Sequence, residues 1–150
     1  MTKRPAGVSR DAGVVAELFV DASAWYPLAR PNHPDHELLA RVFDQAIHRG
    51  TRIVTTNLVV AEAHALLLSR TSRDIALAFL QAVREPRNVM VTSTPELEAA
   101  AVRDWLERYD DHDFSFADAV SFAVMAGRGI REALTLDRHF AAAGFRMVPG

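Results

Sequence analysis

Four acidic residues lie in apolar stretches of the sequence with few basic residues nearby: Asp21, Glu62, Asp118 and Asp137. Two of them directly follow apolar runs of strand type, and the other two lie inside apolar segments with helical spacing. Acidic side chains are rarely buried without a partner. The first three nevertheless have no Lys or Arg within four positions in the sequence. The pattern therefore indicates that these carboxylates share a partner of another kind.

Two carboxylates about 4 Å apart repel each other by roughly 4 kcal/mol at an effective dielectric constant near 20. Four that converge therefore need either protons or cations. Hard oxygen ligands select Mg²⁺ or Mn²⁺, ions that keep some waters and bind substrate phosphates. One or two such ions can activate a water and stabilise the leaving oxygen of an in-line displacement at phosphorus. The hypothesis that follows is a metal-dependent phosphodiesterase.

Each acid also has a purely structural interpretation. Asp118 stands three residues after Ser115, which fits a capping box at a helix start. Asp137 is placed to cap a helix that begins after it, Asp21 to cap a turn before Ser23, and Glu62 to be a solvated helix residue. A capping carboxylate keeps a second oxygen, so capping does not prevent metal binding.

The elements that must position these acids alternate between apolar strand-like runs and amphipathic segments. Strands are expected over 18–20, 52–55, 88–92, 132–136 and 145–148, and helices over 35–48, 57–69, 72–84, 94–109, 115–126 and 138–143. The segment from 22 to 34 is expected to be broken by its three prolines. This order predicts a three-layer α/β/α sandwich with a mainly parallel, roughly five-stranded sheet. Ligands of such folds bind beyond the carboxyl ends of the strands, where the strand order reverses.

Composition excludes several other chemistries. The chain has 150 residues and no cysteine, so it has no disulfide, thiolate metal site or cysteine nucleophile. Its only lysine is Lys3, which argues against a Walker or Schiff-base lysine. No apolar stretch reaches the roughly 18 residues of a membrane span, and no signal peptide is visible. We expect a cytoplasmic protein with no membrane contact, a poorly ordered leader over 1–15 and one domain over 16–150.

The four acids lie in four ordered motifs, which read VDASAW at 20–25, TNLVVAE at 56–62, FSFADA at 114–119 and LTLDRHF at 134–140. This set resembles the motifs of PIN-domain ribonucleases, most closely the VapC-type toxins of type II toxin–antitoxin systems, over roughly residues 17–148. The resemblance implies a PIN-like nuclease domain over 16–150. It also implies a catalytic acidic quartet of Asp21, Glu62, Asp118 and Asp137 that holds Mg²⁺ or Mn²⁺. Ser23 matches the hydroxyl of the first motif and would orient Asp21 or a water on the metal.

The same resemblance implies an endoribonuclease that cleaves single-stranded or looped RNA, often tRNA or rRNA, and leaves a 3′-hydroxyl and a 5′-phosphate. Such toxins typically form homodimers, and a cognate antitoxin protein inserts a segment into the active-site groove. Two features depart from the family pattern: about 16 residues precede the first strand, and Asp113 is an extra acid near the site. Asp113 is either part of a solvated loop or a further residue at the metal.

Other residues are weaker candidates. The pair His33 and His36 has metal-like spacing that Pro34 interrupts, which favours a substrate-facing loop. We expect His64 and His139 to have structural or surface roles. We assign the aromatic residues Trp25, Tyr26 and Phe140 to the core, with the alternative that one near the site stacks an unpaired base. Four arginines are either a phosphate-binding rim or plain solvated surface: Arg30, Arg41, Arg49 and Arg52.

Two other functions remain open. A metal-dependent phosphatase on the same scaffold requires an Asp-x-Asp motif after the first strand. Here Ser23 stands in place of the second aspartate, and the usual lysine is missing. A non-enzymatic binding module would use the acidic pocket to hold a cation or a basic peptide. A Ser-His-Asp hydrolase is disfavoured because no Gly-x-Ser-x-Gly elbow exists.

Overall fold

The apolar runs form strands that lie side by side in one sheet. A computed structural model describes residues 14–150, so the predicted leader, apart from its last two residues, lies outside the described residues. In this part of the chain, five strands pair in parallel throughout, in the order β3-β2-β1-β4-β5. They are β1 (Glu17–Val20), β2 (Arg52–Thr56), β3 (Asn88–Val91), β4 (Glu132–Leu134) and β5 (Arg146–Val148). The predicted parallel α/β sandwich is confirmed.

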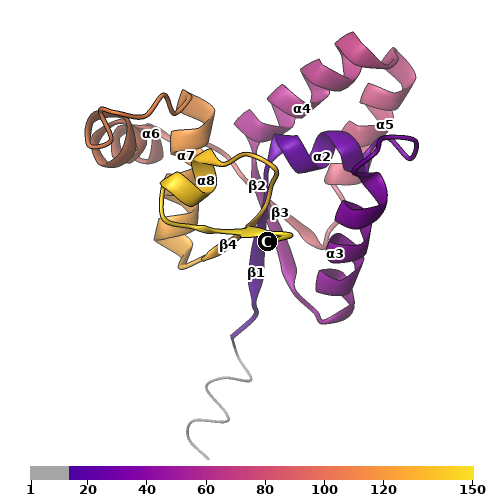
Figure 1. Cartoon of the computed structure of the whole chain (residues 1–150), viewed down its shortest axis with the longest axis horizontal. Coiled ribbons are helices and arrows are strands. Elements are labelled where there is room, and N and C mark those ends of the chain that lie inside the picture. Colours follow the sequence, from indigo (N-terminus) through magenta and orange to yellow (C-terminus); the bar gives the residue numbers. More distant parts are fainter. Residues whose placement is uncertain (1–13) are drawn as a thin grey trace, which may run out of the picture.

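Helices cover the two faces of this sheet (Figure 1). One side carries α2 (Ala22–Leu28), α3 (His36–His48), α4 (Asn57–Arg70) and α5 (Arg73–Val83). The other side carries α6 (Pro95–Ala101), α7 (Phe116–Arg128) and α8 (His139–Ala142), with a π-helical segment η1 (Val102–Glu107) directly after α6. The chain therefore winds in one direction from β1 to β3 and in the other direction from β4 to β5, so the strand order reverses between β1 and β4.

Three element boundaries differ from the expectation. The segment after Asp21 forms the helix α2 despite its prolines, because Pro27 lies next to the last residue of the helix and Asp21 caps its start. The helix expected over 94–109 ends at Ala101 and continues as the π-helical η1. The strand expected over 132–136 ends at Leu134. This last difference leaves Thr135 and its neighbours in a loop, free to face the sheet edge.

Aromatic residues hold the helices of the second face in place. The buried Phe122 of α7 packs edge to face against Phe140 of α8 at 5.0 Å and against Phe114 at 5.1 Å between ring centroids. Such pairs add about 0.5–1.5 kcal/mol beyond the burial of their area. Because Asp118 lies one turn before Phe122, this packing fixes the start of α7 relative to α8.

An ion pair connects the first strand to α7 and gives a testable pH dependence. Arg128 donates two hydrogen bonds, of 3.0 and 2.8 Å, to the Glu17 carboxylate, and Arg52 lies 3.8 Å from it. The hydrogen bond from Arg128 is the main reason that the pKa of Glu17 lies below its usual value. The pair therefore stabilises the fold above the ordinary glutamate pKa, and the stabilisation is lost as pH falls through the lowered value.

We expect Glu17→Gln to lower the free energy of unfolding at pH 7 by about 1 kcal/mol. The difference from the wild type should shrink as pH falls through the lowered pKa of Glu17 and disappear once this carboxylate is protonated. Urea unfolding at several pH values measures this. Glu132→Gln breaks a more exposed pair with Arg146 and is the matched control, with an expected effect near zero. A constant difference at all pH values would contradict the ion-pair explanation.

Candidate active site

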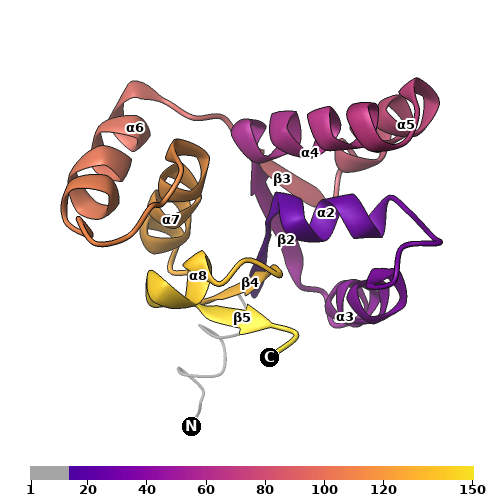
Figure 2. The same cartoon turned by 45° about the horizontal axis from the view of Figure 1, so that its top comes forward.

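The acidic residues meet at the carboxyl edge of the sheet, beside the point where the strand order reverses. Asp21 directly follows β1, and its backbone N–H donates to the carbonyl oxygen of Leu134, the last residue of β4, at 3.1 Å. The loop after β4 carries Asp137. Figure 2 shows this loop beside the start of α2, with α7 and α8 next to it. Parallel α/β folds bind ligands at this kind of position.

Hydroxyl groups fix the carboxylate of Asp21, which is 5% exposed. Its Oδ2 accepts hydrogen bonds from Ser23 Oγ at 2.9 Å and from Thr135 Oγ1 at 3.1 Å. Ser23 Oγ in turn accepts from the backbone N–H of Leu136 at 2.9 Å. Ser23 therefore holds the carboxylate of Asp21 and joins it to the loop after β4. Thr135 was not predicted, because the sequence placed it inside a strand.

A second group of side chains lies next to this network. Asp118 Oδ2 is 3.1 Å from Nδ1 of His139, and the same nitrogen is 3.6 Å from Asp137 Oδ1. Each of these three residues offers one ligand atom, and the three atoms lie within 4.8 Å of one another. The assignment of His139 to a purely structural or surface role was therefore incomplete. The signal was its position two residues after Asp137, at the start of α8.

The capping roles of Asp118 and Asp137 are compatible with their place in this cluster. Asp118 completes the capping box of α7: its N–H donates to Ser115 Oγ at 3.0 Å, and its Oδ2 accepts from the N–H of Ser115 at 3.4 Å. Asp137 Oδ1 accepts from the N–H of His139 at 2.9 Å. The local caps therefore hold both carboxylates in fixed positions at the sheet edge.

Electrostatics show that all four acids are close enough to interact. Burial raises the pKa of Asp21, with a smaller contribution from the charge of Asp118, against the hydrogen bond from Ser23. Partial loss of hydration raises the pKa of Glu62, followed by the charges of Asp21, Asp118 and Asp137. Glu62 itself lies on α4 with its side chain open to solvent. The hydrogen bond to Asp118 raises the pKa of His139.

This set of groups fits a divalent cation. Carboxylate oxygens predominate, which suits Mg²⁺ and Mn²⁺, whereas the imidazole of His139 is a ligand that other divalent transition metals prefer. Among residues 14–150, His139 is the basic side chain within 4.0 Å of these carboxylates, and one imidazolium cannot balance four of them. Asp113 is exposed, and its charge contributes to the raised pKa of His139. It is not among the three residues whose ligand atoms cluster.

The other histidine and aromatic candidates have structural contacts. His33 Nδ1 accepts from the N–H of Asp35 at 3.0 Å, and His36 Nδ1 is 2.9 Å from the carbonyl oxygen of Pro27, so the two imidazoles serve separate backbone contacts. The aromatic residues near the site are core residues, at most 7% exposed: Trp25, Tyr26 and Phe140.

For three of the four arginines the structure favours the alternative of plain surface over a phosphate-binding rim. Arg49 caps the end of α3 and Arg52 begins β2, so both lie at the amino edge of the sheet, opposite the acids. Arg41 is 4.0 Å from Glu37 on the same helix. The reason is topological, because α3 has to deliver the chain to the start of β2. Arg30 alone lies beyond the carboxyl edge, in the loop after α2.

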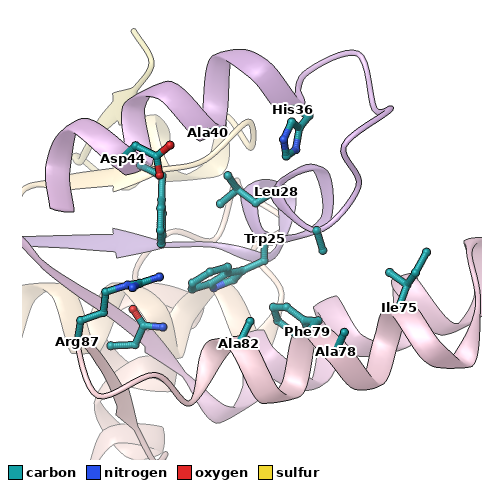
Figure 3. Close-up of a pocket in the computed structure, with 13 residues that line it drawn as sticks. Trp25, Leu28, His36, Ala40, Asp44, Ile75, Ala78, Phe79, Ala82 and Arg87 are labelled. Carbon is teal, nitrogen blue, oxygen red and sulfur yellow. The ribbon is translucent and has the colours of Figure 1, made fainter. Parts of the chain in front are cut away.

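A separate cavity of about 500 Å³ lies between α2, α3 and α5. Figure 3 shows Trp25 and Phe79 inside it, with His36, Asp44 and Arg87 around them. None of the four clustered acids lines it. Its lining is mainly apolar, and the cluster of possible metal ligands lies at the carboxyl edge of the sheet and not in this cavity. Over residues 14–150, no helix has the length and apolar character to cross a membrane.

The chain is similar to known proteins in both sequence and fold. The chain is 36% identical over 129 residues to the 23S rRNA-specific endonuclease VapC20 of Mycobacterium tuberculosis, which covers 85% of this chain and 95% of that protein. The crystal structure of VapC20, described as a sarcin-ricin loop cleaving toxin, superposes with a TM-score of 0.78 at 34% identity, over 85% of this chain and 95% of that one.

VapBC2 from Rickettsia felis, bound to a DNA fragment from its promoter, shares the fold, with a TM-score of 0.67 at 9% identity over 87% of this chain and 96% of that one. The family model of the PIN domain matches residues 18–146, a range that contains all four acids. The chain therefore belongs to the PIN domain family.

Proposed function

We propose that this protein is a divalent-metal-dependent endoribonuclease that acts as the toxin of a toxin–antitoxin pair. The observation that carries the proposal is the cluster of Asp118, Asp137 and His139, whose ligand atoms lie within 4.8 Å of one another. Asp21 stands at the end of the neighbouring strand, and partial burial, followed by the charges of these acids, raises the pKa of Glu62. Membership of the PIN domain family and the similarity to VapC20 support it.

In this proposal Asp21, Asp118 and Asp137 hold Mg²⁺ or Mn²⁺, and Glu62 completes the acidic set from α4. A bound ion supplies a Lewis acid that activates a water and neutralises charge on the phosphate. Ser23 and Thr135 act through Asp21, since their hydroxyl groups hold its Oδ2 in one position. We therefore assign Ser23 the role of a positioning residue, which acts through Asp21 and not directly on the substrate.

For the substrate we propose a looped segment of ribosomal RNA, because VapC20 is named as an endonuclease specific for 23S rRNA. A tRNA loop is the alternative. With either substrate, the proposed location of the protein is the cytoplasm, where ribosomes and tRNA are found. The proposed partners are a cognate antitoxin, because VapC20 is described as a toxin, and a second copy of this chain in a homodimer.

The test is to map RNA ends. Purified protein is incubated with ribosomes and with total tRNA, in Mg²⁺, in Mn²⁺ and in a chelator, and new 5′-phosphate ends are sequenced. We expect a small number of new ends in 23S rRNA that require the divalent ion. New ends confined to tRNA would exclude the ribosomal substrate. Hydrolysis of a small phosphomonoester with no RNA cleavage would favour the phosphatase, and no turnover of either would favour a binding module.

A further inference from the structure

Two arginines from different elements converge on one tyrosine ring. Tyr26 lies on α2, one turn beyond Ser23, and its ring is buried. Arg30 Nη1 donates to the Tyr26 hydroxyl at 2.7 Å, and Arg30 Cζ is 5.4 Å from the ring centroid. Arg70, the last residue of α4, has its Cζ 5.7 Å from the same centroid. The two guanidinium groups therefore lie within about 11 Å of each other.

Positive charge at this place is not balanced by a neighbouring carboxylate. Among residues 14–150, neither Arg30 nor Arg70 has an acidic oxygen within 4.0 Å. Asp35, on the loop after Arg30, instead lies 3.9 Å from His33. Arg70 is exposed and Arg30 is half-buried. Two cations held by one ring without a carboxylate partner attract an anion such as a nucleic acid backbone, and the guanidinium fork of each fits a phosphate.

The arrangement of the helices places this pair beside the acidic site. Both α2 and α4 begin at the carboxyl edge of the sheet and lie side by side (Figure 2). Arg70 comes eight residues after Glu62 on α4, which is about 12 Å along the helix axis. Tyr26 comes five residues after Asp21, which is about 7 Å along α2. An RNA strand that crosses the acidic site can reach both arginines within a few nucleotides.

We propose that Arg30 and Arg70, held by Tyr26, bind backbone phosphates of the substrate RNA next to the scissile bond. This inference rests on the proposed ribonuclease function and names the part of the chain that holds the substrate. The ring restricts the two long side chains through cation–π contact, so less freedom is lost when phosphate binds. Contacts to phosphate position the strand without reading its bases.

The test is the salt dependence of RNA binding with divalent ions chelated, so that the wild type does not cleave. A labelled single-stranded RNA is titrated by fluorescence anisotropy across a range of salt concentrations. Each phosphate contact contributes about 0.7 to the slope of log K against log salt for single strands. This slope is negative, so Arg30→Gln and Arg70→Gln should each make it less steep by about 0.7, and the double variant by about 1.4. Each single change should weaken binding by roughly 3- to 10-fold.

Arg84→Gln is the matched control, because Arg84 is an exposed arginine at the end of α5, at the opposite edge of the sheet. Its slope should equal that of the wild type. Arg30→Lys keeps the charge and should retain most of the slope. In the presence of metal, the double variant should show a raised KM with kcat unchanged. A thermal midpoint close to that of the wild type verifies that the variants are folded.

An unchanged slope in the double variant, with a wild type that binds and cleaves RNA, would overturn this inference and leave the ribonuclease function standing. The inference would also fail if the substitutions weakened only the binding of the antitoxin. If the wild type neither binds nor cleaves RNA, the proposed function itself fails.

Discussion

Asp21→Asn is expected to lower the rate of RNA cleavage at least a hundredfold at saturating substrate and metal. Asp21 is the most constrained acid of the site, because burial and two hydroxyl groups hold its carboxylate in place. The amide accepts the same hydrogen bonds, so the geometry is kept, but it carries no charge and offers one oxygen where the carboxylate offers two. Loss of a few kcal/mol of charge stabilisation in the transition state corresponds to a factor of about 10² to 10³.

Single-turnover cleavage of the mapped RNA measures this effect. Asp44→Asn is the matched control, since Asp44 lies on α3 beside the separate cavity and is exposed. It undergoes the same chemical change and should cleave at the wild-type rate. Cleavage by Asp21→Asn within tenfold of the wild type would contradict the assignment of Asp21 to the metal site.

Much of the fold could be predicted because its signals are local. Short apolar runs separated by helical segments specify a parallel sheet, and an acid directly after such a run must stand at the carboxyl edge. The sequence pattern therefore predicts that Asp21 and Asp137 lie close together. The helix α2 was missed, because three prolines outweighed the capping residue Asp21 in the sequence pattern. A proline near the end of a short helix removes few hydrogen bonds.

The parts of the site that could not be predicted depend on tertiary contacts. Thr135 reaches Asp21 across 114 positions, and only the early end of β4 at Leu134 allows it. His139 meets Asp118 across 21 positions because Phe122 and Phe140 pack α7 against α8. The positions of the arginines could not be predicted for a related reason. Their positions depend on which edge of the sheet each helix end reaches, and Arg70 meets Tyr26 only because α4 lies beside α2.

The second large effect concerns stability without metal. The pKa of Asp21 is raised in the folded protein, so the unfolded chain loses this proton at a lower pH. Stability is therefore lost as pH rises through the folded pKa, and above that pKa the ionised Asp21 destabilises the fold. In a chelator, Asp21→Asn should raise the free energy of unfolding by roughly 1–3 kcal/mol.

Asp118→Asn is the informative comparison for this effect. Nδ1 of His139 lies 3.1 Å from Oδ2 of Asp118. Removing the charge of Asp118 therefore relieves repulsion among the acids but also weakens this favourable contact. We expect its stability in a chelator to stay level with that of the wild type. An equal gain in both variants would mean that His139 contributes nothing to the balance of charge at the site.

Urea unfolding of the wild type and of Asp21→Asn, each in a chelator and in saturating Mn²⁺, tests most directly whether four carboxylates share one cation. A ligand at one hundred times its Kd stabilises a fold by about 2.7 kcal/mol. We predict that Asp21→Asn is the more stable protein in the chelator and that Mn²⁺ reverses the order by stabilising the wild type alone. A wild type that is already the more stable protein in the chelator and does not respond to Mn²⁺ would contradict the shared cation.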